Sequence, residues 1–210
     1  MRNIQAQGAK LILLGRNRHL DGQYLDKWRH IPLTYTSGQP VDNRFREDHY
    51  EILLFPAASS FSFHHAANHL LRYHFYPPSV MSHVSDFSVQ NRHMQQGDRI
   101  IQRIRQPFPF GLTIIEGLTM NEISDVIDEP RRAGFTYVTT AAHEEIGEWS
   151  ARVEWRSDDV LMLIVHAISR TSERIPSWTM PVVRYMQKRA HHLGIAYFQT
   201  HVSQSSSTNS

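Results

Sequence analysis

Between residues 80 and 169 the chain alternates short runs of strand-forming residues with hairpin-length linkers, and this succession constrains the fold more than any other feature. The runs fall at roughly 80–87, 98–105, 112–127 with a break, 133–141, 148–156 and 159–169. In the clearest run, Trp149, Val153 and Trp155 alternate with polar residues, which indicates one apolar and one polar face. An antiparallel meander of this length must curl to cover its apolar face.

Two segments with helical periodicity flank the strands. The first has apolar residues at helical spacing from Phe63 to Leu71, after Ser59, which suits an N-cap. The second begins near Thr179 and carries an apolar stripe at Val182, Met186, Ala190, Leu193 and Tyr197. This order of elements predicts an α+β helix-grip fold, in which a curved antiparallel sheet of about six to seven strands wraps around a long C-terminal helix.

The two ends of the chain differ in composition from this domain. Residues 1–48 are rich in Arg, Asn, Gln, Asp and Gly without a sustained period, and predict a polar arm that packs irregularly or stays mobile. Residues 49–200 then form the helix-grip domain, and residues 201–210 predict a disordered tail. No apolar run is long enough for a signal sequence or a membrane span, so we expect a cytoplasmic protein.

Composition limits the kinds of catalytic, metal and ligand sites that the chain can form. The chain has no cysteine, which excludes disulfides, thiolate zinc sites, iron–sulfur clusters and cysteine nucleophiles. Its 22 basic and 20 acidic residues nearly balance, and no nucleic-acid-binding motif accompanies them, so no nucleic-acid partner is expected. Nucleotide-binding glycine loops and the serine-hydrolase elbow are absent too, and we expect no cofactor.

A series of motifs runs through the second half of the chain. Its members are Asp128-Glu129-Pro130, Gly134-Phe135, Tyr137, His143-Glu144-Glu145-Ile146-Gly147-Glu148, Val153-Glu154-Trp155, Ser169-Arg170 and Gln187-Lys188-Arg189. Over about residues 49 to 198 this series resembles domain-of-unknown-function family 1990. The resemblance implies an architecture similar to the START-like and polyketide-cyclase proteins, with an apolar cavity between sheet and helix, but it implies no settled activity.

The first functional hypothesis is that the cavity binds an apolar or aromatic small molecule. The expected lining comes from the strands and the terminal helix: Phe135, Trp149, Val153, Trp155, Met162, Ile164, His166 and Met186. For His166 the alternative is a hydrogen bond to the backbone or to a tyrosine, because most buried polar groups have a partner within the protein.

The second hypothesis makes the same cavity the active site of a cofactor-independent cyclase, isomerase or hydrolase. An imidazole beside carboxylates suits a general acid or base near neutral pH, so His143 would act, with Glu145 or Glu148 orienting it. Tyr137 and Arg170 would donate hydrogen bonds to a developing oxyanion. The alternatives are a polar β-turn for residues 143–148 and an ion pair for Arg170.

The 14 histidines allow two further readings. His65 and His69 stand at i, i+4 on the first helix, a spacing that can bind zinc, but nothing completes the ligand set and no metal site is expected. The third hypothesis is a protein-interaction module in which the arm and this helix bind a partner. A homodimer is the candidate assembly.

Overall fold

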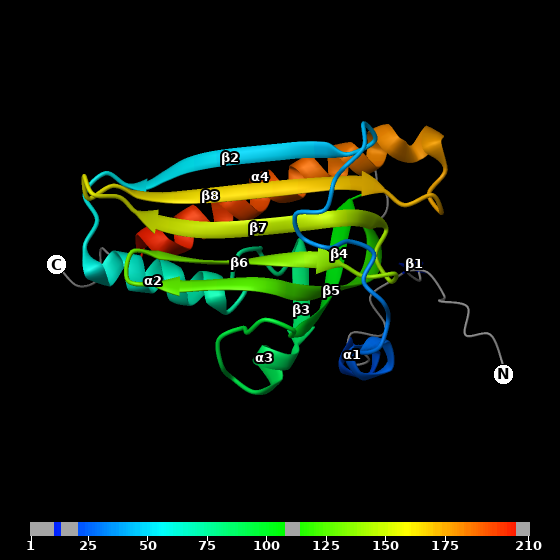
Figure 1. Cartoon of the computed structure of the whole chain (residues 1–210), viewed down its shortest axis with the longest axis horizontal. Helices are drawn as coiled ribbons and strands as arrows, with labels where there is room; N and C mark the ends of the chain where they lie inside the picture. Colours follow the sequence, from blue (N-terminus) through cyan, green and yellow to red (C-terminus); the bar gives the residue numbers. More distant parts are fainter. Residues whose placement is uncertain (1–10, 14–20, 108–113, 205–210) are drawn as a thin grey trace.

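A curved antiparallel sheet and two helices on one of its faces form the body of the computed structural model, which describes residues 11–13, 21–107 and 114–204. The elements are β1 (Leu11–Leu13), α1 (Asp21–Trp28), β2 (Arg46–Phe55), α2 (Ser60–Leu71), β3 (Met81–Ser85), α3 (Asp86–Val89), β4 (Arg99–Pro107), β5 (Ile114–Glu129), β6 (Arg132–Thr139), β7 (Glu145–Trp155), β8 (Leu161–Thr171), the 3-10 helix η2 (Ser177–Thr179) and α4 (Met180–Gln204). The strand order is β2-β8-β7-β6-β5-β4-β3, and β1 pairs with β5. The predicted helix-grip fold is confirmed (Figure 1).

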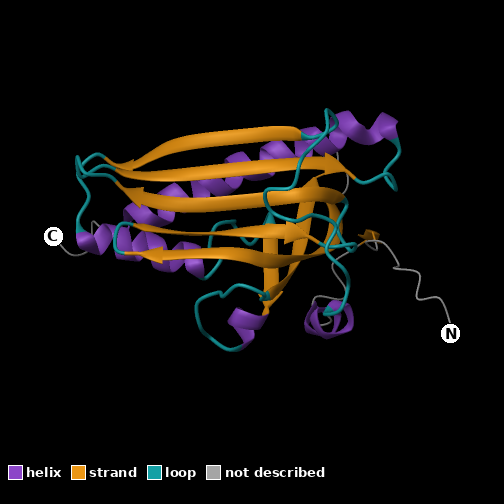
Figure 2. Ribbon diagram, viewed as in Figure 1, coloured by secondary structure: helices purple, strands orange, loops and turns teal. Residues whose placement is uncertain are grey.

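The sheet bends strongly around α2 and α4, so that β3 and β4 run across the direction of β2, β8 and β7 (Figure 2). A register shift between Ile123 and Asp125 in β5 accounts for the break expected in this strand. We call the face toward α2 and α4 the inner face and the opposite face the outer face.

Aromatic side chains fill the inner face. The ring of Phe75 lies 5.1 Å from that of Trp149 and 5.7 Å from that of Phe198, measured between centroids. Gly194 lets α4 approach these rings closely, because a Cβ at this position would lie 2.5 Å from the Phe75 ring. The interface of α4 with the sheet is therefore tightly packed in the C-terminal half of the helix.

The start of each helix agrees with the sequence, but the C-terminal end and the buried stripe of α4 do not. Residues 201–204, expected in a disordered tail, continue α4 with Val202 fully buried, and residues 205–210 lie outside the described ranges. Ser59 caps α2 in a capping box with Ser62. The buried residues of α4 are Ala190, His191, Gly194, Ile195, Phe198 and Val202. Val182, placed on the buried stripe by its spacing, is exposed. The first turns of α4 project past the strand ends (Figure 1), so apolar residues there have no sheet to cover. Over the described residues, no helix is both long and apolar enough to cross a membrane.

The polar arm contains a helix that its composition did not indicate. Leu25 and Trp28 of α1 pack on the outer face against Ile101, Leu118 and Met120. A bridge between Leu33 and Thr140 continues the contact along the sheet. The arm therefore covers part of the outer face and leaves the inner face to α2 and α4.

Gly147 offers a test of how closely β7 and β8 approach. A Cβ at this position would lie 2.0 Å from the Ile168 carbonyl oxygen, which belongs to the backbone and cannot move aside cheaply. We expect Gly147→Ala to lower the free energy of unfolding by about 2–3 kcal/mol in chemical denaturation. Gly117→Ala is the matched control, since nothing lies within 4 Å of its Cβ. Equal stability of the two variants would contradict the close approach.

Candidate functional site

Polar side chains from three strands and α4 meet at one end of the inner face. We call this group the inner polar cluster: Asp48 of β2, Glu145 of β7, Ser169 of β8, and Arg184 and Gln187 of α4. The Gln187 amide donates to Ser169 Oγ at 2.9 Å and to Glu145 Oε2 at 3.2 Å. The Arg184 guanidinium donates to both carboxylate oxygens of Asp48, at 2.5 and 2.6 Å, and to Gln187 Oε1 at 2.7 Å. The cluster joins the N-terminal half of α4 to the sheet.

Strand register explains why these residues meet. Asp48 is paired with Ala167, and Ser169 is paired with Gly147, so their side chains share the inner face. Glu145 stands two residues before Gly147 and therefore points to the same side.

Glu145 is the titratable centre of the cluster. Burial raises the pKa of its carboxyl group to about 7, against a lowering effect of the Arg184 charge; the charges of Asp48 and Glu144 add to the rise. Burial also raises the pKa of Tyr76 and of Tyr137, and the charge of Glu145 contributes in both cases. Near neutral pH, this carboxyl group can therefore exchange a proton inside the protein.

An aromatic wall extends from Glu145 into the core. The Tyr137 ring stacks on Trp149 at 5.4 Å between centroids, and Tyr76 lies 6.1 Å from the same indole. The indole N–H of Trp149 is buried and has no hydrogen-bond partner among the described residues. A donor of this kind is costly to bury unpaired. The wall thus offers both apolar surface and one unused donor.

The structure brings most of the predicted inner-face residues together. Phe135, Tyr137, Trp149 and Val153 are buried in the inner core. Trp155 packs against this core with the Arg131 guanidinium 4.1 Å from its ring, and its indole N–H also lacks a partner among the described residues. Met186 is half-buried on α4. Their role in holding a ligand stays a prediction.

The predicted face of Met162, Ile164 and His166 was wrong. On β8 the inner core takes the residues of opposite parity, from Leu161 to Ala167. Both faces of this strand are apolar, so alternation could not distinguish them. His166 instead lies on the outer face, where its Nε2 is 2.8 Å from a carboxylate oxygen of Glu47. The alternative of a backbone or tyrosine partner was also wrong, because the partner is the carboxylate of Glu47, whose side chain is 64% exposed.

The five residues proposed for catalysis do not form one group. Tyr137 and Glu145 face inward, while Glu148 and Arg170 occupy outer-face positions of β7 and β8. His143 is buried in the turn before β7, where its Nδ1 accepts a hydrogen bond from the Glu145 backbone N–H at 2.9 Å. Burial lowers the pKa of His143 to about 4, partly offset by that hydrogen bond. The ring is neutral at pH 7 with its acceptor nitrogen already engaged, which is unsuitable for a general base.

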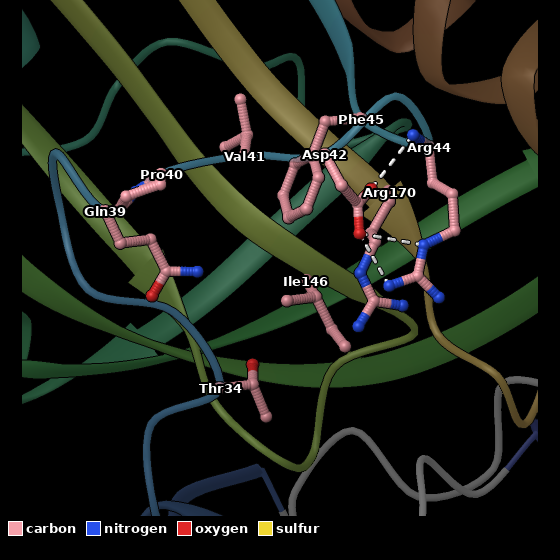
Figure 3. A pocket seen from close by; sticks show the side chains of 9 residues that line it. All are labelled: Thr34, Gln39, Pro40, Val41, Asp42, Arg44, Phe45, Ile146 and Arg170. Atoms are coloured by element: carbon pink, nitrogen blue, oxygen red, sulfur yellow. Dashed lines mark hydrogen bonds and ion pairs between the residues drawn. The ribbon is translucent and has the colours of Figure 1, made fainter.

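Arg170 lines a cavity of about 360 Å³ on the outer face, beneath the arm (Figure 3). Its guanidinium lies 5.7 Å from the Phe45 ring and 3.9 Å from a carboxylate oxygen of Glu173. Asp42 and Arg44 form a second ion pair at the same rim, at 2.6 Å. A further cavity, of about 500 Å³, lies between the arm and β5. The ion pair expected as the alternative for Arg170 is present.

Histidines of α2 and of the segment after it lie close together. The rings of His65 and His69 are 4.6 Å apart between centroids, and those of His69 and His74 are 5.6 Å apart. Over the ranges that the structure describes, no three His, Cys, Asp or Glu side chains are grouped to hold a metal ion.

Sequence reasoning missed most of the inner polar cluster. Ser169 and Gln187 belonged to the quoted motifs, but neither was selected as a site residue. Asp48 lies at the boundary between arm and domain, and Arg184 follows no motif. Parity along β7 and β8 could have placed Ser169 beside Glu145, whereas the contacts from α4 required the tertiary structure.

Glu145→Gln tests the burial of the carboxyl group. The folded-state pKa lies above the ordinary value of 4.5. The buried charge of Glu145 therefore does not destabilise the native state below pH 4.5 and destabilises it fully above about pH 7. We expect the variant to be more stable than the parent by up to about 3 kcal/mol at pH 8 and equal to it near pH 4. Denaturation curves at both pH values measure this. Glu148→Gln, on the outer face, is the control; a pH-independent effect of Glu145→Gln would contradict the assignment.

Comparisons with known proteins place the chain in a family. Similar solved structures include Ara h 8.0201 (TM-score 0.44, 11% identity, 76% of this chain and 99% of that one). Others are the hypothetical protein jhp0584 from Helicobacter pylori (0.49, 10%, 80% and 99%) and the major latex-like protein 151 from Panax ginseng (0.48, 13%, 76% and 98%). No curated protein matches the sequence. The family model described as "Domain of unknown function (DUF1990)" matches residues 31–196, and the chain therefore belongs to the DUF1990 family.

Proposed function

We propose that this protein binds a small molecule with an apolar or aromatic body and a hydrogen-bonding group, held between the inner face of the sheet and α4. The body of the molecule contacts Tyr76, Tyr137 and Trp149. Its polar group reaches the inner polar cluster, where Gln187 and Glu145 can donate or accept. The N-terminal half of α4 moves away from the sheet to admit the molecule, because the C-terminal half is fixed by close packing at Gly194.

The observation that carries this proposal is the buried, unpartnered indole N–H of Trp149, whose ring contacts Tyr76 and Tyr137, the two tyrosines that the charge of Glu145 reaches. Buried donors are almost always paired, so the unpaired indole N–H of Trp149 marks a position in the core where an acceptor on a ligand would be favourable. A ligand acceptor at this position would remove the cost of the unpaired donor. The faces of the aromatic rings around it supply apolar contact area that needs no hydrogen-bond partner.

A fluorescence titration with anilinonaphthalene sulfonate, an aromatic anion, tests the proposal. We expect saturable binding to the folded protein. Trp149→Phe keeps the ring contacts and removes the donor, and should weaken binding about five-fold, the equivalent of one hydrogen bond. Trp178→Phe is the matched control, because the Trp178 side chain is 80% exposed.

Two outcomes of this titration would contradict the proposal. One is the absence of saturable binding by a protein that unfolds cooperatively. The other is equal weakening of binding by Trp149→Phe and Trp178→Phe, which would place the probe outside the space between the sheet and α4. Native mass spectrometry of protein purified from a cell extract gives an independent readout, since a retained small molecule adds a discrete mass.

A cofactor-independent acid–base reaction at the same place is the second candidate function. The observation that favours it is the Glu145 carboxyl group, whose pKa of about 7 suits proton transfer at neutral pH. In this version Glu145, rather than His143, moves the proton. Glu145→Gln would then abolish turnover of a bound substrate while retaining its binding.

A further inference from the structure

The N-terminal end of α4 exposes large apolar side chains. We call Trp178, Met180, Val182 and Tyr185 the docking tip; their exposed fractions are 80%, 39%, 36% and 61%. The other exposed large apolar residues of the described chain, such as Leu53, Phe61 and Val89, come from different elements. Single exposed apolar residues are ordinary, but four within one short segment are not.

Helical spacing places Val182 and Tyr185 on one side of α4, whereas Trp178 precedes them in η2 and Met180, at the start of α4, stands on the opposite side. The exposed stripe then continues to Lys188, one turn beyond Tyr185, and to His192. This end of α4 projects beyond the strand ends (Figure 1), so a flat surface could reach it without meeting the sheet.

The charged residues of α4 are all basic. Its 25 residues include Arg184, Lys188 and Arg189 but no Asp or Glu. Arg184 is paired with Asp48 inside the inner polar cluster, whereas Lys188 is exposed on the stripe that carries the tip. An apolar, Trp- and Tyr-bearing surface beside cationic residues on a helix is the combination that binds the interface of an anionic bilayer.

We propose that the docking tip binds the surface of a membrane containing anionic lipid, with Trp178 and Tyr185 inserted at the headgroup level and Lys188 contacting lipid phosphates or carboxylates. A second copy of the chain fits this surface less well. A two-fold interface between tips would bring two Lys188 side chains and two acid-free helices together, and their charges would repel. The inference stands independently of a ligand between sheet and helix.

Sedimentation with lipid vesicles tests this proposal on the full chain. Vesicles are made of phosphatidylcholine alone or with phosphatidylserine as the minor component. We expect the protein to sediment with the mixed vesicles, less with phosphatidylcholine alone, and less at high salt. The double variant Trp178→Ser, Tyr185→Ser should lose at least about ten-fold in its partition coefficient, because two interfacial aromatic side chains are removed.

Val89→Ser is the matched control, since Val89 is 72% exposed on α3, outside the tip. Lys188→Gln should weaken binding to the mixed vesicles only. Circular dichroism and thermal unfolding verify that all variants fold. The proposal is overturned if the wild-type protein does not bind mixed vesicles, or if the double variant binds as well as Val89→Ser. A third outcome also overturns it: the wild-type protein does not bind vesicles, and analytical ultracentrifugation shows a dimer that is absent in the double variant. The docking tip would then bind a second copy of the chain.

Discussion

Arg103→Met is expected to lower the free energy of unfolding by about 3–5 kcal/mol. Arg103 is 1% exposed, and its guanidinium donates to Asp21 of α1 and to Glu116 of β5, the latter at 2.9 Å. Burial opposes the charge of Glu116, but hydrogen bonds from Arg105 and Arg103 outweigh it and lower the pKa of this carboxyl group. Removal of the arginine leaves the buried Asp21 carboxylate without this partner, while Glu116 keeps Arg105 at 2.8 Å, and a buried unpaired charge is strongly unfavourable.

Urea denaturation of the variant measures this loss. The control is Arg132→Met, which breaks an exposed pair with Glu129 at 3.1 Å, and such pairs contribute at most about 1 kcal/mol. Asp21→Asn in the Arg103→Met background should recover part of the stability, because it removes the buried charge that lost Arg103. A cost below about 1 kcal/mol for Arg103→Met would show that the ion pairs do not fasten α1 to the sheet.

The second large effect is a loss of stability in acid. Burial lowers the pKa of four histidines to about 4: His69, His83, His143 and His191. Between pH 6.5 and pH 4 the unfolded chain binds protons at these positions and the native protein does not, so stability falls as the pH falls. Glu145 has the opposite effect on stability, because its raised pKa means that the native state takes up a proton at a higher pH than the unfolded chain does. The net loss should be on the order of 5 kcal/mol.

His143→Asn isolates one of these contributions. The Asn carbonyl can accept the Glu145 backbone N–H that His143 Nδ1 now accepts, as in an Asx-turn, but it does not titrate. We expect the variant to lose up to about 3 kcal/mol less than the parent between pH 6.5 and pH 4. His192→Asn is the control, since His192 is exposed. An unchanged pH profile for His143→Asn would contradict the burial of this ring.

The sequence predicted the order of the elements because each signal was local. Alternation at Trp149, Val153 and Trp155 requires only one strand, and the capping residue Ser59 requires only the first turn of α2. The family motifs agreed with these signals over the same residues. Aromatic residues of β6 and β7 were therefore placed on the correct face.

Features that depend on tertiary contacts could not be predicted. The faces of β8 are both apolar, so the orientation of Met162 and Ile164 depends on which layer covers each side. The pairing of Asp48 with Arg184 joins residues 136 positions apart in the chain. Val182 was predicted to lie on the buried stripe of α4 but is exposed, because periodicity does not reveal where the sheet ends.

The indole N–H signal of Trp149 in a ¹H–¹⁵N NMR spectrum, followed during a titration with anilinonaphthalene sulfonate, tests the proposed site most directly. The chain has four tryptophans, which lie in distinct environments and serve as internal references. We expect the Trp149 signal to shift saturably as its unpaired donor gains an acceptor, while the signal of the outer-face Trp28 stays in place. A titration in which Trp149 does not respond, or in which only the exposed Trp178 does, would contradict ligand binding between the sheet and α4.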